Sequence, residues 1–319
     1  MVNFSLNFNL FNNYYYFYER LLVLLFSLVP AIMLVAFILY TDRKSKEPAK
    51  NIIICLLSGT LTVALAGYLE QLTMPYFANN IVLTYVWATI EELCKVAVFF
   101  LFIFDNKHYD DIYDGLVYMA LIALSFAGLE NIIYAFSEST VSESINLALM
   151  RDFTTIPLHV ICGIVMGYFL SLGNFSKSGF KKVKNIVVAV LLAGIIHGTF
   201  NNLMSFLGDI KVDYNNQIEV LLTQALPLIL IMFVLVIIVF IVSNKAVILN
   251  EMFINNEEYD RKYNYLMNSN EYMESASLKK RIDIHNKLVH NKEESIVDIN
   301  IYSKDKSVEN EIDRLFDDI

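Results

Sequence analysis

The stretch ATIEELCKVAVFF (Ala88–Phe100) lies within residues 81–104, a run that is otherwise largely apolar. As a helix, a run of this length can cross the ~30 Å hydrocarbon core of a membrane. Glu91, Glu92 and Lys95 interrupt it with two carboxylates and an ammonium. An ionisable group at the centre of a membrane helix costs roughly 2.5–3.5 kcal/mol on insertion scales, so it usually faces a partner or a water-filled cavity. The stretch therefore predicts a membrane helix with a polar centre.

The composition of the whole chain agrees with a membrane protein. Of 319 residues, 56% are hydrophobic and 18% are charged, which is too apolar for an ordinary soluble domain. We expect an all-α, polytopic helix bundle in the lipid bilayer, with about seven transmembrane helices. The apolar runs that predict these helices lie at 21–40, 51–73, 81–104, 112–136, 155–174, 185–207 and 217–243.

The charges of the short loops predict the orientation, because Lys and Arg favour the cytoplasmic side. One set of loops holds nine of them: Arg43, Lys44, Lys46, Lys50, Lys107, Lys177, Lys181, Lys182 and Lys184. The alternate side, which includes the loop 137–154, holds only Arg20, Arg151 and Lys211. We therefore expect a multi-pass protein of the cell membrane with the N-terminus outside and the C-terminus cytoplasmic.

The sequence divides into a helical domain at 1–243 and a polar tail at 244–319. The tail carries 16 Asp or Glu and 11 Lys or Arg, too polar a composition for a large core, and we expect it to be cytosolic and partly helical or disordered. The cysteines Cys55, Cys94 and Cys162 show no CxxC spacing, so neither a disulfide framework nor a sulfur-rich zinc site is expected.

Further polar residues interrupt the apolar runs on four predicted helices. They are Glu91, Glu92 and Lys95 on the third, Glu130 and Asn131 on the fourth, His159 on the fifth, and His197 and Asn201 on the sixth. Residues four apart share a helix face, as Glu91 and Lys95 do. Gly163 and Gly167 follow His159 at steps of four, which lets neighbouring backbones approach closely. An ion pair that only fixes helix packing is the structural alternative, but so many polar groups on four helices favour a shared wet pocket.

Four short motifs in this order resemble those of the PrsW-type intramembrane proteases. They are EExxK at Glu91–Lys95, FxxxEN at Phe126–Asn131, HxxxG at His159–Gly163 and HxxxN at His197–Asn201. The resemblance runs from about residue 30 to 205, and Pro30, Tyr40, Asp42, Glu47-Pro48 and Asp114–Tyr118 are also similar to family signatures. The family often has Asp where this chain has Asn201, so that residue either binds a metal or donates a hydrogen bond.

The resemblance implies an intramembrane endopeptidase with Glu91, Glu92, Glu130, His159, His197 and Asn201 in its catalytic site. Two mechanisms stay open. In one, His159, His197 and Glu91 hold a zinc ion whose water attacks the peptide. In the other, similar to the CAAX prenyl endopeptidases, a glutamate activates water and His197 with Asn201 stabilises the oxyanion. The chain has no HExxH motif, so a zincin-like helix is excluded as the basis for a metal site.

The resemblance also implies the partner, a single-pass membrane protein of the anti-sigma factor type. In bacteria, such a protein is cut first on its outer side in a regulated stress-response cascade. No nucleic-acid partner is expected. An ion- or proton-coupled transporter and a non-catalytic membrane adaptor on the same fold are the alternatives, but the internal repeat typical of many transporters is not evident here.

Overall fold

The computed structural model describes residues 14–41, 47–77, 79–176, 178–210 and, within 229–247, all positions except 231 and 235. The chain divides into two compact units, Met1–Ala246 and Val247–Ile319, and only Val247 of the second unit is described. The predicted tail thus lies almost entirely outside the described residues.

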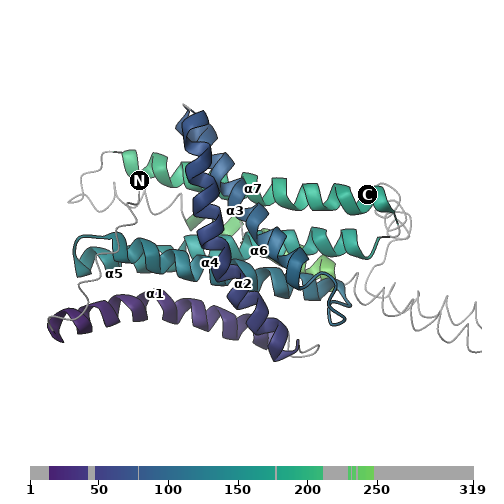
Figure 1. The fold of residues 1–319 in the computed structure, drawn as a ribbon, viewed down its shortest axis with the longest axis horizontal. Helices are drawn as coiled ribbons and strands as arrows, with labels where there is room; N and C mark the ends of the chain where they lie inside the picture. Colours follow the sequence, from purple (N-terminus) through teal and green to yellow (C-terminus); the bar gives the residue numbers. More distant parts are fainter. Residues whose placement is uncertain are drawn as a thin grey trace, which may run out of the picture. The chain divides into compact units, whose positions relative to one another are not determined.

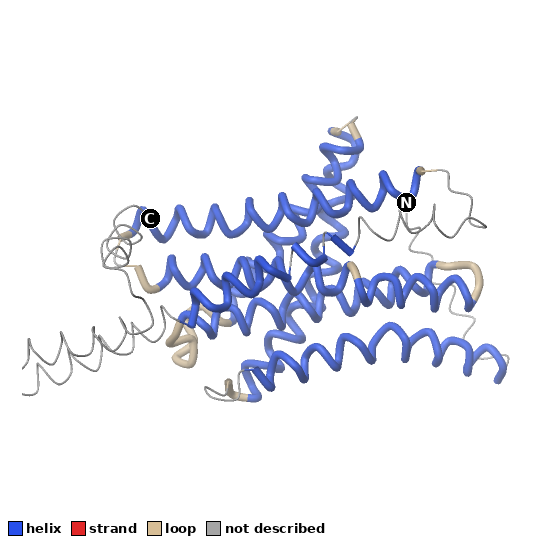
Figure 2. Tube along the Cα trace, turned by 180° about the vertical axis from the view of Figure 1, so that it is seen from behind, coloured by secondary structure: helices blue, strands red, loops and turns tan. Residues whose placement is uncertain are grey.

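Every regular element in the described residues is helical (Figures 1 and 2), as the fold class predicted. The α-helices are α1 (Tyr14–Thr41), α2 (Ala49–Thr73), α3 (Asn80–Phe102), α4 (Ile112–Ser137), α5 (Val141–Phe153), α6 (Thr155–Asn174) and α7 (Gly179–Asp209), and a 3-10 turn, η1 (Met74–Tyr76), follows α2. Described residues between 229 and 247 are also helical.

Five segments of the described chain are long and apolar enough to cross a membrane: Phe17–Tyr40, Ala49–Tyr76, Ile112–Ser137, Val141–Asn174 and Gly179–Asp209. Helix α3, with 23 residues, has a similar length but carries three ionisable side chains. Large apolar side chains are exposed along α1, α2 and α7, as expected for surfaces that face lipid. Six of the seven predicted helices are therefore present, and part of the seventh, 217–243, lies outside the described residues.

The prediction of a loop at 137–154 is wrong, because this segment contains the helix α5. Thr140 and Glu143 form a capping box in which the Thr140 hydroxyl accepts from the Glu143 backbone and the Glu143 carboxylate accepts from the Thr140 backbone. With only 13 residues and a polar face, α5 is too short and too polar for a search based on long apolar runs. It packs against α1, α4 and α6.

Helix α4 is at the centre of the packing. It contacts α1, α2, α3, α5 and α6, while α7 packs against α3 and α6. Figure 1 shows α2 running obliquely to α1 and α7. Most of α4 is buried, including the continuous stretch from Leu116 to Leu124. A helix that is apolar on all sides is typical of such a central position.

Close contact between α4 and α6 depends on the glycines of the fifth predicted helix, as the sequence indicated. A Cβ atom at Gly163 would lie 2.6 Å from the Met119 carbonyl oxygen and 2.8 Å from the Ala123 Cβ. At Gly167, a Cβ atom would collide with the backbone of Gly115. Because the shortest of these contacts are with backbone atoms, which cannot turn aside, the two helices can approach this closely only where a side chain is missing.

The signature residues Glu47 and Tyr118 also meet in the structure. The Tyr118 hydroxyl donates to the Glu47 carboxylate, and the Asn51 amide donates to the Tyr118 oxygen at 2.9 Å. Burial raises the pKa of Glu47 above its usual range. The segments Glu47-Pro48 and Asp114–Tyr118 therefore join the start of α2 to the start of α4, away from the histidines.

We predict that Gly163→Ala destabilises the protein, because the added methyl group must push α4 and α6 apart. Overpacking of this kind costs about 1–3 kcal/mol. Gly67→Ala is the matched control, since a Cβ atom on that residue of α2 would have no neighbour within 4 Å. The measurement is the thermal unfolding midpoint of each purified variant in the same detergent. Equal midpoints for the two variants would contradict the packing argument.

Candidate active site

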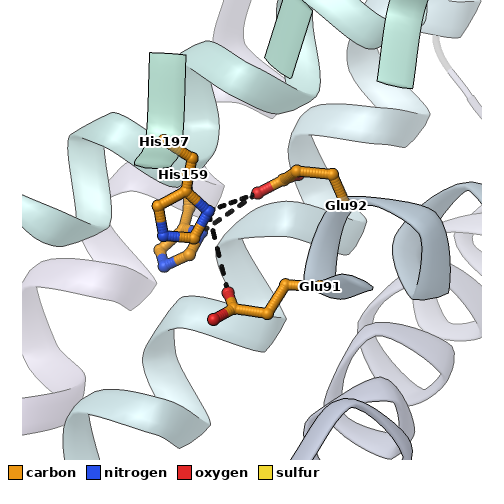
Figure 3. Close-up of side chains that lie close together, drawn as sticks. All are labelled: Glu91, Glu92, His159 and His197. Carbon is orange, nitrogen blue, oxygen red and sulfur yellow. Dashed lines mark hydrogen bonds and ion pairs between the residues drawn. The ribbon is translucent and has the colours of Figure 1, made fainter. Parts of the chain in front are cut away.

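Three membrane helices bring four ionisable side chains to one point (Figure 3). Glu91 and Glu92 come from α3, His159 from α6 and His197 from α7, and one possible ligand atom from each lies within 4.8 Å of the others. All four are buried: Glu91 is 8% exposed, and the other three are 1% exposed or less. The convergence predicted from the motifs is thus present for these residues.

Glu92 is at the centre of the cluster. Its Oε1 atom lies 2.8 Å from the Lys95 Nζ and 2.8 Å from the His197 Nδ1. The Nδ1 atom of His159 is 3.8 Å from the same oxygen. Because a carboxylate that leaves water needs donors or opposite charge, Lys95 and His197 together make it possible to bury this group. Lys95 thus lies where a counter-charge for a buried carboxylate is needed.

Glu91 is more loosely held. Its Oε2 atom lies 3.8 Å from both the Lys95 Nζ and the His197 Nδ1, beyond hydrogen-bond distance. In the described residues this buried oxygen has no hydrogen-bond partner. Glu70 of α2, which lies close to the end of its helix, interacts with the Glu91 carboxyl group. The structure therefore adds Glu70 to the surroundings of the site.

Glu130 lies behind His159 rather than inside the cluster. Its Oε2 atom is 3.2 Å from the His159 Nε2 and 2.7 Å from the Nη2 of Arg151, a residue of α5. Arg151 had been counted only as a loop charge. The signal that could have revealed its role is the capping box that begins α5, since a helix there can bury Arg151 against α4.

The other polar residue of the FxxxEN motif is structural. The Asn131 amide donates to the Asp152 carboxylate at 3.0 Å, so it ties α4 to α5. The motif's aromatic residue is Phe126. The centroid of its ring lies 4.1 Å from the Lys95 Nζ and 5.3 Å from the centroid of the His159 ring. A cation over an aromatic face is stabilised by the ring quadrupole. Phe126 thus forms part of the wall around the cluster.

Asn201 is not joined to the cluster. It lies one turn after His197 on α7 and is partly buried, and among the described residues no hydrogen bond links it to the carboxylates or the histidines. Its neighbour Asn202 donates to the Gly198 carbonyl within α7 and to the Ile81 carbonyl of α3. The role predicted for Asn201 therefore stays a prediction.

The hydrogen bonds fix the tautomer of His159. Lys95 Nζ lies 3.0 Å from the His159 Nδ1 and can only donate, so Nδ1 must accept. On the other side of the ring, the Glu130 carboxylate can only accept, so Nε2 carries the hydrogen. The lone pair of Nδ1 therefore points into the cluster, toward Glu92.

The cluster fits a divalent metal ion. Two imidazole nitrogens and two carboxylates are a common ligand set for zinc, and in catalytic sites three protein ligands leave one position open. Glu91 Oε2 and Glu92 Oε2 are buried without hydrogen-bond partners in the described residues, as free ligand atoms would be. The His159 Nε2–H bond to Glu130 is the carboxylate contact that metal-binding histidines usually make. Lys95 would have to leave the His159 Nδ1 if that nitrogen bound the ion.

Buried carboxylates and histidines that meet at one point in a helical membrane bundle are typical of a functional site, and an intramembrane hydrolase is one class that has such a site. The sequence matches a family described as "PrsW family intramembrane metalloprotease" over residues 47–249, so the chain belongs to that family. It is an intramembrane protease.

Curated relatives agree with this assignment. "Protease PrsW" of Clostridioides difficile (strain 630) is 29% identical over 188 residues, which are 57% of this chain and 79% of the relative. "Protease PrsW" of Oceanobacillus iheyensis is 30% identical over 178 residues, 55% of this chain and 79% of the relative. The protein of the same name from Bacillus subtilis (strain 168) is 28% identical over 120 residues, 38% and 52% of the two chains. No solved structure matches this chain.

We predict that the purified protein binds one divalent metal ion per chain, and that His159→Ala and His197→Ala each lose it. Each substitution removes an imidazole from a set of four possible ligands. The measurement is elemental analysis after gel filtration, with Glu138→Gln as control, because Glu138 is exposed at the end of α4. Wild-type protein that cleaves a substrate while it contains no stoichiometric metal would instead assign the reaction to glutamate-activated water.

Proposed function

We propose that the protease cleaves a single-pass membrane protein of the anti-sigma factor type near its extracytoplasmic juxtamembrane segment. The resemblance of the motifs supports the substrate class, and the depth of the site supports the side of cleavage. Glu91 is 11 residues from the start of α3, about 16 Å at 1.5 Å per residue. His159 is only four residues from the start of α6, about 6 Å. With the N-terminus outside, both starts face outward.

The other two helices place their residues on the same side. Glu130 precedes the end of α4 by seven residues, about 10 Å, and His197 precedes the end of α7 by 12 residues, about 18 Å. In the proposed orientation both ends face outward as well. By this measure these residues lie about 6–18 Å from the outer ends of their helices, in the outer half of the membrane or close to its midplane. A substrate that leaves the membrane on that side would present its juxtamembrane peptide to them.

We propose zinc as the metal, because nitrogen and carboxylate donors in a set of four suit it. Of the two carboxylates, Glu92 lies closer to the histidine nitrogens than Glu91, the ligand expected from the sequence. Glu92 thus shares the ligand set with His159 and His197. When bound, zinc would supply a nucleophilic water at neutral pH and polarise the peptide carbonyl.

The chain's own residues then divide the proton transfers between them. Glu91 is the least buried of the four, and its Oε2 atom is without a hydrogen-bond partner in the described residues, so it accepts the proton of the attacking water. The protonated Glu91 returns this proton to the leaving amine when the C–N bond breaks. Lys95 stays beside Glu92 and offsets its charge. Asn201, one turn beyond His197, donates to the carbonyl oxygen as negative charge develops on it.

We predict that co-expression with anti-sigma factor candidates yields an amino-terminal and a carboxy-terminal fragment, and that Glu91→Gln abolishes both. Gln has nearly the same shape but cannot accept the proton, so a loss of at least about 100-fold is expected. Immunoblots with a tag at each end of the substrate measure the fragments, and Glu138→Gln is the control. Unchanged cleavage by Glu91→Gln at normal protein levels would exclude Glu91 as the base.

We predict the membrane orientation from the two ends of α7. Gly179 and Gly208 are exposed, and an added side chain at either position would have no neighbour within 4 Å. In intact cells, Gly208→Cys should react with a membrane-impermeant maleimide and Gly179→Cys should not. The native cysteines are buried and should add little background. The reverse pattern would overturn both the orientation and the side of cleavage.

A further inference from the structure

Arg151 of α5 belongs to none of the four motifs, but it contacts Glu130, which in turn contacts His159. Its Nη2 atom lies 2.7 Å from the Glu130 Oε2, and the side chain is 9% exposed. The guanidinium carbon lies 4.2 Å from the centroid of the Tyr134 ring, so the group also stacks on α4. Such a buried, planar cation is held in one place more firmly than a surface ion pair would be.

Arg151 and His159 share one oxygen atom. The Glu130 Oε2 accepts from the Arg151 Nη2 and from the His159 Nε2–H. The opposite nitrogen of the His159 ring accepts from Lys95. The imidazole is therefore held between a carboxylate and an ammonium, and only the Nε2–H tautomer satisfies both neighbours.

We propose that Arg151 is a positioning residue: it fixes the Glu130 oxygen that orients His159 and keeps the His159 Nδ1 lone pair facing Glu92. Its role in metal binding and cleavage rests on the proposed function, whereas its effect on the tautomer does not. Without the guanidinium, the Glu130 carboxylate loses its shortest contact and is free to turn away from the ring. The hydrogen of His159 is then no longer confined to Nε2.

The next residue of α5 provides a matched control. Asp152 is buried, accepts from Asn131 and interacts electrostatically with Arg151, but in the described residues no hydrogen bond or ion pair joins it to Glu130 or to the cluster. Asp152→Ala therefore weakens the attachment of α5 to α4 without touching Glu130. If Arg151 acted only by attaching α5, Arg151→Met and Asp152→Ala would have the same effect on His159.

The direct test is nitrogen NMR of the histidine side chains in the full chain, prepared without metal in lipid nanodiscs. The sequence has five histidines, and His159→Gln identifies the signals of that ring. We expect the wild type and Asp152→Ala to show the hydrogen of His159 on Nε2, and Arg151→Met to show a mixture of tautomers. Unchanged His159 signals in Arg151→Met, or equal changes in both variants, would overturn the proposal.

Arg151→Lys keeps the measurement decisive if Arg151→Met does not accumulate. Lys retains the positive charge but lacks the planar fork. We expect it to keep the Nε2–H tautomer in at least half of the molecules. Loss of the Nε2–H preference in Arg151→Lys, with the fold intact, would show that a cation beside Glu130 does not hold the ring and would overturn the proposal.

Kinetics give a second, independent readout on a substrate that the wild type cleaves and Glu91→Gln does not. Loss of a residue that supports a metal ligand typically lowers metal affinity or activity by about 10–100-fold. We therefore expect Arg151→Met to lower kcat by about 10-fold or more with little change in KM. In a Glu130→Gln background, Arg151→Met should add no further loss. If the two losses in kcat multiplied in the double variant, Arg151 would act on cleavage by a route other than Glu130.

Discussion

The site depends on how the Glu92 carboxylate is stabilised away from water. A buried carboxylate without partners would destabilise the folded protein or take up a proton. Here one oxygen atom of Glu92 accepts from Lys95 of its own helix and from His197 of α7, both at 2.8 Å. The groups that allow Glu92 to be buried thus belong to the cluster or lie directly beside it.

The second layer of the site follows from the first. His159 can accept from Lys95 through Nδ1 only if its other nitrogen, which carries the hydrogen, has an acceptor, and Glu130 provides one. Glu130 in turn is a buried carboxylate that requires a cation, which Arg151 supplies. Each polar residue therefore creates the need for the next, from α3 through α6 and α4 to α5. Such a chain of obligatory partners makes a membrane active site more rigid than its helix packing alone would.

Much of the fold could be predicted from the sequence, because long apolar runs have few alternatives in a bilayer. The predicted boundaries of 155–174 and 112–136 agree with α6 and α4 almost to the residue. The grouping of Glu91, Glu92, His159 and His197 was also predicted, since their motifs occur on successive helices. Helix periodicity alone suggested Glu91 as the closest partner of Lys95, whereas the structure gives that place to Glu92.

What the sequence could not give depends on tertiary contacts. Helix α5 is short and polar, so its stability comes from its cap and from packing on α1, α4 and α6. Its charged residue Arg151 was therefore indistinguishable from a solvated loop residue. The separate roles of Glu130 and Asn131 were equally hidden, because adjacent residues of a helix point in different directions and only the neighbours show what each one meets.

The pairing of Glu92 with Lys95 within one helix bears on how the protein enters the membrane during synthesis. The other close partner of Glu92, His197, follows 105 residues later in the chain. At a translation rate of roughly 5–20 residues per second, α3 would wait about 5–20 s for that partner. Lys95, three residues away, is available as soon as α3 forms, and it can neutralise the carboxylate while the helix leaves the translocon. The lysine thus allows an early helix to carry a carboxylate into lipid before the other helices of the cluster have been made.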